Sequence, residues 1–154
     1  ADVKPFSADM AKRCGAYEAL LVNTDAGKGR LSDMGTGHFD AVIECSGTQN
    51  GLDLAVDMCG MAGSVYLFGW HRTSRTLDFK LGHLRGQTLV HTSPATDTGR
   101  LYERYWPTTI ALFQQGIFDM SKLVTHKYRA EDIQKCMDDS VARPDGFIKS
   151  VFYL

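Results

Sequence analysis

The stretch Phe39-Asp40-Ala41-Val42-Ile43-Glu44-Cys45-Ser46-Gly47 contains the clearest strand signal of the sequence. Its β-branched and almost continuously apolar residues are typical of a strand that is covered on both faces, as in a parallel sheet. We expect the strand to end at its serine-glycine pair. A helix is predicted next, because apolar residues recur at helical spacing from Leu52 to Cys59, and Gly60 and Gly63 are expected to stop it before a second strand over residues 64–68. This order indicates a βαβ unit.

The same alternation continues on both sides of this unit. Ser7–Cys14 is predicted to be a helix with a serine cap and a left-handed Gly15, whereas Asn23–His38 is either a mobile loop or a segment with a short helical turn. Pro107 falls inside the predicted helix at 98–115, so it must kink that helix or mark its true start, and we expect a kink. Further strands are predicted at 19–22, 87–93 and 147–154, and further helices at 77–85, 98–115 and 130–142. The fold is therefore expected to be α/β, with a truncated, doubly wound parallel sheet and a short C-terminal helix-strand addition.

The composition is that of an ordinary globular protein. The 154 residues are 44% hydrophobic and 23% charged, and the formal net charge is −1. The 17 basic and 18 acidic residues create no field that would attract nucleic acid or a membrane surface, so neither partner is expected. No apolar run is long enough to span a membrane, and no secretory signal opens the chain. We therefore expect a cytoplasmic protein.

The chain has four cysteines and no CxxC pair that would indicate a zinc knuckle or a redox couple. We expect Cys14, Cys45, Cys59 and Cys136 to be buried small hydrophobes. The aromatic residues Tyr102, Tyr105 and Trp106 are expected to lie in the core or at a subunit contact. His71, beside Arg72 and Arg75, could bind an anion, but a structural or solvated cluster is the simpler interpretation.

Three predicted strand ends are candidate ligand sites. In an open α/β sheet, ligands bind beyond the carboxyl ends of the strands, and Ser46-Gly47, Gly69-Trp70 and Thr92-Ser93 are three such ends. A glycine at a strand end lets the backbone approach a flat ligand closely. The alternative is that Gly47 and Gly69 are only turn glycines.

Several motifs in register resemble the C-terminal part of the medium-chain, zinc-type alcohol and polyol dehydrogenases. They are the stretch 39–47 quoted above, the stretch Gly60-Met61-Ala62-Gly63-Ser64-Val65-Tyr66-Leu67-Phe68-Gly69, then Leu123-Val124-Thr125-His126, and finally Gly146-Phe147-Ile148-Lys149-Ser150-Val151. The resemblance covers essentially the whole chain and implies a Rossmann-like fold. It is specific for the family and not for a substrate.

The resemblance also implies a set of residues that bind NAD. Asp2 would take the adenosine ribose hydroxyls and repel a 2′-phosphate, which favours NAD over NADP, and Ser46-Gly47 would flank the adenosine side. Phe68-Gly69-Trp70 would present backbone to the nicotinamide, Thr92-Ser93 would hydrogen-bond its carboxamide, and Lys149 would lie near the pyrophosphate. For Asp2 and Lys149 the alternative is a solvated residue at a chain end or on a strand.

Other parts of such an enzyme are absent from the sequence. The sequence contains no glycine-rich GxGxxG turn, no HxxxH or HExxH spacing and no Gly-x-Ser-x-Gly elbow. The resemblance implies that the catalytic zinc ligands and the proton relay lie in an N-terminal half outside this chain. We therefore expect no catalytic residue and no metal site here.

These inferences lead to two hypotheses about function. In the first, residues 1–118 are a partial dinucleotide-binding domain that lacks its first βα unit, and residues 119–154 are a C-terminal segment of a catalytic domain. The chain would then be the cofactor-binding part of an NAD-dependent dehydrogenase of small alcohols or polyols, inactive alone. In the second, it is a non-catalytic module that binds nucleotide weakly or only associates with a partner. Bare apolar surface is expected to be covered by a missing N-terminal half or by a second copy in a homo-oligomer.

Overall fold

The structure is a computed structural model that describes residues 1–92 and 100–153. The chain divides into two compact units, one formed by Leu31–Arg104 and the other by Ala1–Arg30 together with Tyr105–Leu154. The helix α2 (Asp25–Met34) runs across the boundary between them. The residue range 23–38 thus holds a ten-residue helix, where the sequence indicated a loop or a short turn.

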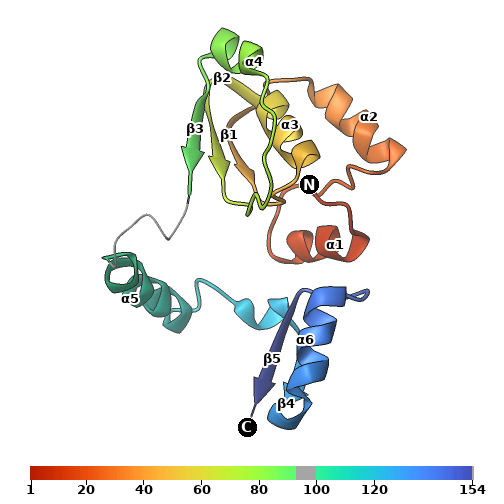
Figure 1. Cartoon of the computed structure of the whole chain (residues 1–154), viewed down its shortest axis with the longest axis vertical. Coiled ribbons are helices and arrows are strands. Elements are labelled where there is room, and N and C mark those ends of the chain that lie inside the picture. The colour runs from red at the N-terminus through yellow and green to blue at the C-terminus, as the bar shows by residue number, and fades with distance from the viewer. Residues whose placement is uncertain (93–99, 154) are drawn as a thin grey trace. The chain divides into compact units, whose positions relative to one another are not determined.

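The unit Leu31–Arg104 is built on a three-stranded parallel sheet (Figure 1). Its strands lie in the order β1-β2-β3, and each strand pairs with the next in parallel. Two helices connect the strands, so the predicted α/β class with a parallel sheet is confirmed. In chain order the elements are β1 (Phe39–Glu44), α3 (Gln49–Met58), β2 (Cys59–Leu67), α4 (Phe79–Arg85) and β3 (Thr88–His91).

The strand β2 begins directly after α3, earlier than predicted. Gly60 and Gly63 lie inside this strand instead of stopping the helix before it. Both positions approach other backbone too closely for a side chain. A Cβ atom at Gly60 would lie 2.9 Å from the Gly37 carbonyl oxygen, and one at Gly63 would lie 2.9 Å from the Asp40 carbonyl oxygen. These two glycines therefore allow β2 to pack closely against the backbone at the start of β1.

The core of this unit lies between α3 and the sheet. Ala55, Cys59 and Val65 form a buried cluster, and Val42, Leu67 and Leu89 pack against it. The Thr48 hydroxyl caps the start of α3 by accepting a hydrogen bond from the Gly51 amide. At the other end of α3, Arg85 and Gln87 donate to the carbonyl oxygens of Val56 and Cys59.

The prediction that β1 is covered on both faces is wrong for this unit. The side chain of Ile43 is 65% exposed and that of Phe39 is 42% exposed. β2 is the only strand that pairs with β1 among the described residues, so β1 forms an open edge of the sheet. β1 therefore carries more apolar side chains than this unit buries.

The second unit contains helices and a two-stranded parallel sheet. The first helix, α1 (Pro5–Arg13), begins at a proline after Lys4, so the predicted Ser7 cap is wrong, whereas Gly15 has the expected left-handed conformation with φ of 97°. The predicted strand at residues 19–22 is only a single bridge between Asp2 and Leu21. The later elements are α5 (Arg100–Gln114, which begins in the other unit), the 3-10 helix η2 (Met120–Leu123), β4 (Val124–Arg129), the 3-10 helix η3 (Ala130–Asp132), α6 (Ile133–Ala142) and β5 (Lys149–Tyr153).

The C-terminal helix-strand addition is confirmed, and it is larger than expected. β4 and β5 pair in parallel, and α6 packs along them through the buried Cys136 (Figure 1). The same helix leaves Ile133, Met137 and Val141 exposed. Pro107 lies inside α5, so it does not mark the start of that helix.

Two expectations about side-chain burial fail in part. Cys59 and Cys136 are buried as expected, but Cys14 and Cys45 are exposed. Tyr105 and Trp106 are also largely exposed, so they are not core residues of their unit. The described helices include none with the length and apolar character that a membrane crossing requires.

Candidate functional site

The carboxylate of Glu44 organises the carboxyl end of β1. Glu44 is the last residue of the strand, and only 3% of its surface is exposed. Its Oε1 atom accepts hydrogen bonds from the Ser46 amide at 2.6 Å, from the Ser46 hydroxyl at 2.5 Å and from the Gly47 amide at 3.0 Å. The buried charge is thus compensated by donors of the turn that follows it, and that turn is held in one conformation.

The same residue also holds the turn at the end of β2. The Glu44 carbonyl oxygen accepts hydrogen bonds from the Phe68 amide at 2.9 Å and from the Gly69 amide at 2.7 Å. The Oε2 atom accepts a hydrogen bond from the Gly47 amide at 3.1 Å, and it lies 3.1 Å from His71 Nε2, which is not aligned for a hydrogen bond. Two strand-end turns are therefore tied to one glutamate.

The glycines in the turns that follow β1 and β2 are required by close packing. A Cβ atom at Gly69 would lie 2.3 Å from the Gly47 nitrogen and 2.6 Å from Glu44 Oε2, and one at Gly47 would lie 2.4 Å from the Trp70 carbonyl oxygen. A Cβ atom at Gly51, in the first turn of α3, would lie 2.1 Å from the Ser46 hydroxyl oxygen. The turns 46–47 and 69–70 thus lie against each other with no room for side chains between them.

The loop after β2 is also tied to the first turn by side chains. Arg75 donates to the Gly47 carbonyl oxygen through Nε at 3.2 Å and through Nη2 at 2.5 Å. Gln49 donates to the Thr76 carbonyl oxygen and accepts from the Thr76 amide. The Arg75 side chain therefore holds the loop in place, and the His71 ring lies against Glu44. For these two members of the cluster His71, Arg72 and Arg75, the structural interpretation is supported.

Around these turns, several predicted residues present groups to solvent. Phe68 and Trp70 are exposed, Trp70 by 83%, on either side of the packed Gly69. At the end of β3, Thr92 donates both its amide and its hydroxyl hydrogen to the Leu67 carbonyl oxygen. The Thr92 hydroxyl oxygen keeps its acceptor capacity, which suits the NH₂ group of a carboxamide.

The remaining predicted residues are not assembled with these turns in one described unit. Asp2 and Lys149 belong to the other unit, where the Asp2 carboxylate accepts hydrogen bonds from the Val3 and Lys4 amides. Lys149 is the first residue of β5 and is exposed. Ser93 lies outside the described residues.

Sequence reasoning did not single out Glu44. It lies within an apolar strand, but a carboxylate at the end of such a strand, two residues before a serine-glycine pair, is a signal for a turn cap. The Cys45 thiol next to it is not an activated nucleophile. Desolvation, and then the Glu44 charge, raise the pKa of this thiol and keep it protonated.

The described residues offer no site for zinc. None of their histidine, cysteine, aspartate and glutamate side chains form a group of three or more that could hold a metal ion. Zinc requires at least three such protein ligands, so the residues described here do not fit a catalytic zinc.

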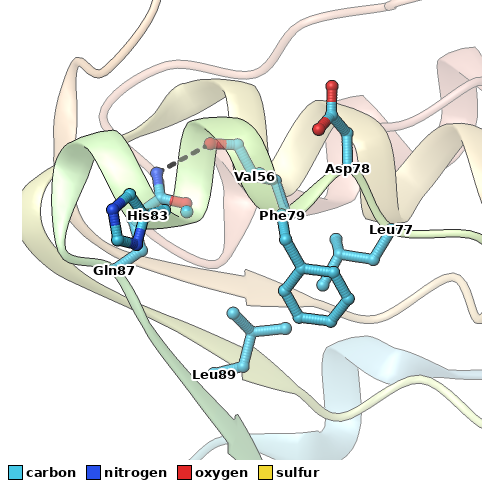
Figure 2. Close-up of a pocket in the computed structure, with 8 residues that line it drawn as sticks. Val56, Leu77, Asp78, Phe79, His83, Gln87 and Leu89 are labelled. Carbon is cyan, nitrogen blue, oxygen red and sulfur yellow. Dashed lines mark hydrogen bonds between the residues drawn. The ribbon is translucent and has the colours of Figure 1, made fainter.

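A cavity of about 320 Å³ lies under α4, lined by Val56, Leu77, Asp78, Phe79, Gly82, His83, Gln87 and Leu89 (Figure 2). Gln87 donates to the Val56 carbonyl oxygen there, and the Phe79 ring points toward Leu89. Val56 and Gln87 precede β2 and β3, so the cavity lies toward the amino ends of the strands. Ligands of parallel sheets bind at the opposite edge, where Glu44 lies.

Comparison with known proteins supports the resemblance seen in the motifs. No family model matches the chain. The chain is 27% identical to L-threonine 3-dehydrogenase of Aliivibrio fischeri (strain MJ11) over 138 residues, which are 89% of this chain and 38% of that protein. It is 25% identical to L-arabinitol 4-dehydrogenase of Hypocrea jecorina over 125 residues, 81% of this chain and 31% of that protein. Among solved structures, zinc dependent alcohol dehydrogenase 2 from Streptococcus pneumonia matches with a TM-score of 0.81 at 19% identity, over 98% of this chain and 42% of that chain.

The solved structure shares the fold of this chain, which confirms the truncated, Rossmann-like α/β class. The chain spans only 38% and 31% of the length of the two curated relatives. These comparisons, together with the motifs, confirm that the chain resembles the C-terminal part of the zinc-type alcohol and polyol dehydrogenases.

Proposed function

We propose that the chain is the cofactor-holding part of an NAD-dependent, zinc-type alcohol or polyol dehydrogenase. The observation that carries this proposal is the pair of glycine turns at the carboxyl ends of β1 and β2, both held by Glu44. Parallel sheets bind dinucleotides at this edge, and the exposed side chains of Phe68 and Trp70 flank the second turn.

Each binding residue has a distinct role in this proposal. The Ser46-Gly47 turn flanks the adenosine, and the Gly69-Trp70 turn presents its backbone to the nicotinamide. Thr92 accepts a hydrogen bond from the carboxamide through its hydroxyl oxygen, because its hydrogen is already donated to Leu67. Ser93 joins Thr92 in this role by resemblance alone.

The roles proposed for Asp2 and Lys149 rest on the family resemblance alone. Asp2 binds the adenosine ribose hydroxyls and disfavours a 2′-phosphate by charge repulsion. Lys149 supplies a positive charge near the pyrophosphate.

The chemical step is assigned to residues outside this chain. In zinc-type dehydrogenases the metal polarises the substrate oxygen and hydride passes to the nicotinamide. Because the described residues lack a set of zinc ligands, we propose no catalytic residue in this chain and expect the chain alone to be inactive.

The test is calorimetric titration of the full chain with NADH and with NADPH. We expect NADH to bind more tightly, by about tenfold, which corresponds to roughly 1.4 kcal/mol of repulsion between the Asp2 carboxylate and the 2′-phosphate. Asp2→Asn should bring the two affinities together. Asp9→Asn, a matched change at an exposed position of α1, should leave the difference intact.

Trp70 allows a second test on the nicotinamide side. Trp70→Ala should weaken NADH binding, whereas Trp106→Ala should not, and these are the two tryptophans of the chain. If the wild-type chain binds neither dinucleotide, the cofactor-holding role is excluded and the association-module hypothesis takes its place.

The division of the chain at residue 118 and its partner are part of the same proposal. Residues 1–118 would belong to the dinucleotide-binding domain and residues 119–154 to the catalytic domain. The exposed apolar residues of β1 and β5, such as Ile43 and Phe152, would pack against an N-terminal half or against a second copy of the chain. Analytical ultracentrifugation and dye binding test this, because a monomer without exposed apolar surface would exclude both partners.

A further inference from the structure

We propose that the cavity under α4 is a further binding site, for a small, flat, apolar molecule that carries one N–H or O–H donor. An apolar wall, a buried acceptor without a partner and a helical glycine that leaves space open support this site. All of its lining residues belong to the unit Leu31–Arg104. The cavity lies toward the amino ends of the strands, away from the turns that Glu44 holds, so the inference is independent of the proposed function.

The wall of the cavity suits an apolar ring. The cavity volume of about 320 Å³ falls within the range of roughly 300–1,000 Å³ that is typical of small-molecule pockets. Val56, Leu77 and Leu89 contribute aliphatic surface. The Phe79 ring, which points toward Leu89, is an aromatic part of the wall (Figure 2). Phe79 is 75% exposed, so a ring packed against it would cover apolar surface that the chain leaves in water.

The polar part of the wall contains an acceptor without a partner. The Gln87 Nε2 atom donates to the Val56 carbonyl oxygen at 3.0 Å and to the Cys59 carbonyl oxygen at 2.6 Å. These two bonds fix the orientation of the amide, because its oxygen would be repelled by both carbonyl groups. Gln87 Oε1 is buried and has no hydrogen-bond partner among the described residues. Since an unpaired buried acceptor is costly, a ligand with a donor group is favoured at this point.

Access to this acceptor involves an exposed side chain. His83 lines the cavity beside the Gln87 amide, and it is exposed (Figure 2). An exposed side chain can change its rotamer without disturbing the core, and such a change would let a donor reach Gln87 Oε1. The Asp78 carboxylate also lines the cavity and repels anions, so the ligand carries no carboxylate or phosphate group.

Gly82 leaves space open next to the acceptor. It lies inside α4, where glycine weakens a helix, and it does not have a positive φ. The nearest atom to a Cβ at this position would be Gln87 Oε1, at 4.0 Å. Neither a turn nor close packing therefore requires a glycine here. A longer side chain would fill the space through which a donor contacts Gln87.

The test compares indole with benzofuran, which has nearly the same shape but a ring oxygen in place of the N–H group. The full chain is titrated with each probe, and the shifts of its amide resonances are followed by two-dimensional NMR. We expect saturable shifts at Gly82, Gln87 and Leu89, and indole should bind about fivefold more tightly, an amount that corresponds to one net hydrogen bond. The absence of saturable shifts at these residues, or an affinity for benzofuran equal to or higher than that for indole, overturns the proposal.

Gly82→Leu tests the place of binding. The leucine side chain should occupy the cavity and lower the indole affinity at least about tenfold. The matched control is Gly29→Leu, at an exposed position inside α2 where a Cβ atom meets no atom within 4 Å, and it should leave the affinity unchanged. If Gly82→Leu binds indole as tightly as the wild type does, the proposal is overturned.

Gln87→Met tests the acceptor separately, and it covers the case in which Gly82→Leu does not fold. Arg85 also donates to the Val56 and Cys59 carbonyl oxygens, so these remain paired in this variant. Indole should lose its advantage, and the two probes should bind within about twofold of each other. A retained preference for indole overturns the proposal. Saturating NADH should not change the indole affinity of the wild type, and competition between the two would place indole in the cofactor site and overturn the proposal as well.

Discussion

Replacing Gly69 by alanine should be among the most destabilising single methyl additions in the chain. The new Cβ atom would lie 2.3 Å from the Gly47 nitrogen, 2.6 Å from Glu44 Oε2 and 2.9 Å from the Cys45 carbonyl carbon. Two of these three atoms belong to the backbone, so no side-chain rotation relieves the clash. The turns after β1 and β2 must move apart.

The size of the effect follows from the contacts that this movement breaks. Overpacking costs about 1–3 kcal/mol. Losing the hydrogen bond from the Gly69 amide to the Glu44 carbonyl oxygen costs about 0.5–1.5 kcal/mol, and losing the one from the Gly47 amide to the buried carboxylate costs about 1.5–3 kcal/mol. We therefore expect Gly69→Ala to lower the free energy of unfolding by at least about 3 kcal/mol.

Urea unfolding followed by circular dichroism measures this change. Gly29→Ala is the matched control, because the same methyl group at Gly29, inside α2, meets no atom within 4 Å. Since alanine favours a helix over glycine, this control should raise the free energy of unfolding by about 0.5–1 kcal/mol. If Gly69→Ala instead unfolds within about 0.5 kcal/mol of the wild type, an amount typical of a neutral surface change, the close packing of the two turns is refuted.

Three further predictions concern other parts of the fold. Thr48→Ala removes the cap of α3 and should cost about 1 kcal/mol in a urea melt, whereas Thr48→Ser should cost much less. Arg85→Met removes the donor that reaches the Val56, Asp57 and Cys59 carbonyl oxygens and should cost about 1.5–3 kcal/mol, and an equal melt for the exposed Arg72→Met and Arg85→Met would contradict this. The hydrogen bond to Asp139, then desolvation, raise the pKa of Tyr128 to about 12. Because the folded pKa lies above the unfolded value of about 10, the stabilisation from this group is complete below that value and is lost as the pH rises toward 12. In a tyrosinate absorbance titration, Asp139→Asn should return this group to the ordinary range.

The strands and helices with strong local signals could be predicted from the sequence. The apolar run 39–45 gave β1 to within one residue, and the helical spacing from Leu52 to Cys59 placed α3. Both signals depend on neighbouring residues alone, since a strand or an amphipathic helix repeats its apolar positions over a few residues.

Glycines account for the main errors in secondary structure. Gly27 and Gly29 indicated a loop, yet both lie in α2. A Cβ atom at Gly27 would lie 1.9 Å from the Leu21 carbonyl oxygen, so this glycine is present because the helix approaches another backbone segment. Gly60 and Gly63 were misread as helix stops for the same reason. A single sequence does not separate a glycine that bends the chain from one that admits a neighbour.

The position of the candidate site could be predicted from the sequence, but the contacts that hold its turns together could not. The rule that ligands bind beyond the carboxyl ends of parallel strands identified the turns at Gly47 and Gly69. The tie between them depends on Glu44, whose carbonyl oxygen accepts from the Phe68 and Gly69 amides far along the chain, and no local pattern reports such a contact. Periodicity also counted Glu44 as one more position in an apolar strand.

The burial of Glu44 shows that the end of β1 does more than pack against its neighbours. A buried carboxylate without partners would cost several kcal/mol, so a strand end that needed only packing would be more stable with an apolar side chain. Here the charge satisfies the Ser46 and Gly47 amides, and the glycines at 47, 51 and 69 leave no room for side chains around it. The sequence therefore has flexible glycines and a buried carboxylate, in place of stiffer and apolar residues, at the end of the sheet where parallel folds bind ligands. Departures from the local rules of stability concentrate at functional sites, and this one coincides with the turns that the proposed cofactor would contact.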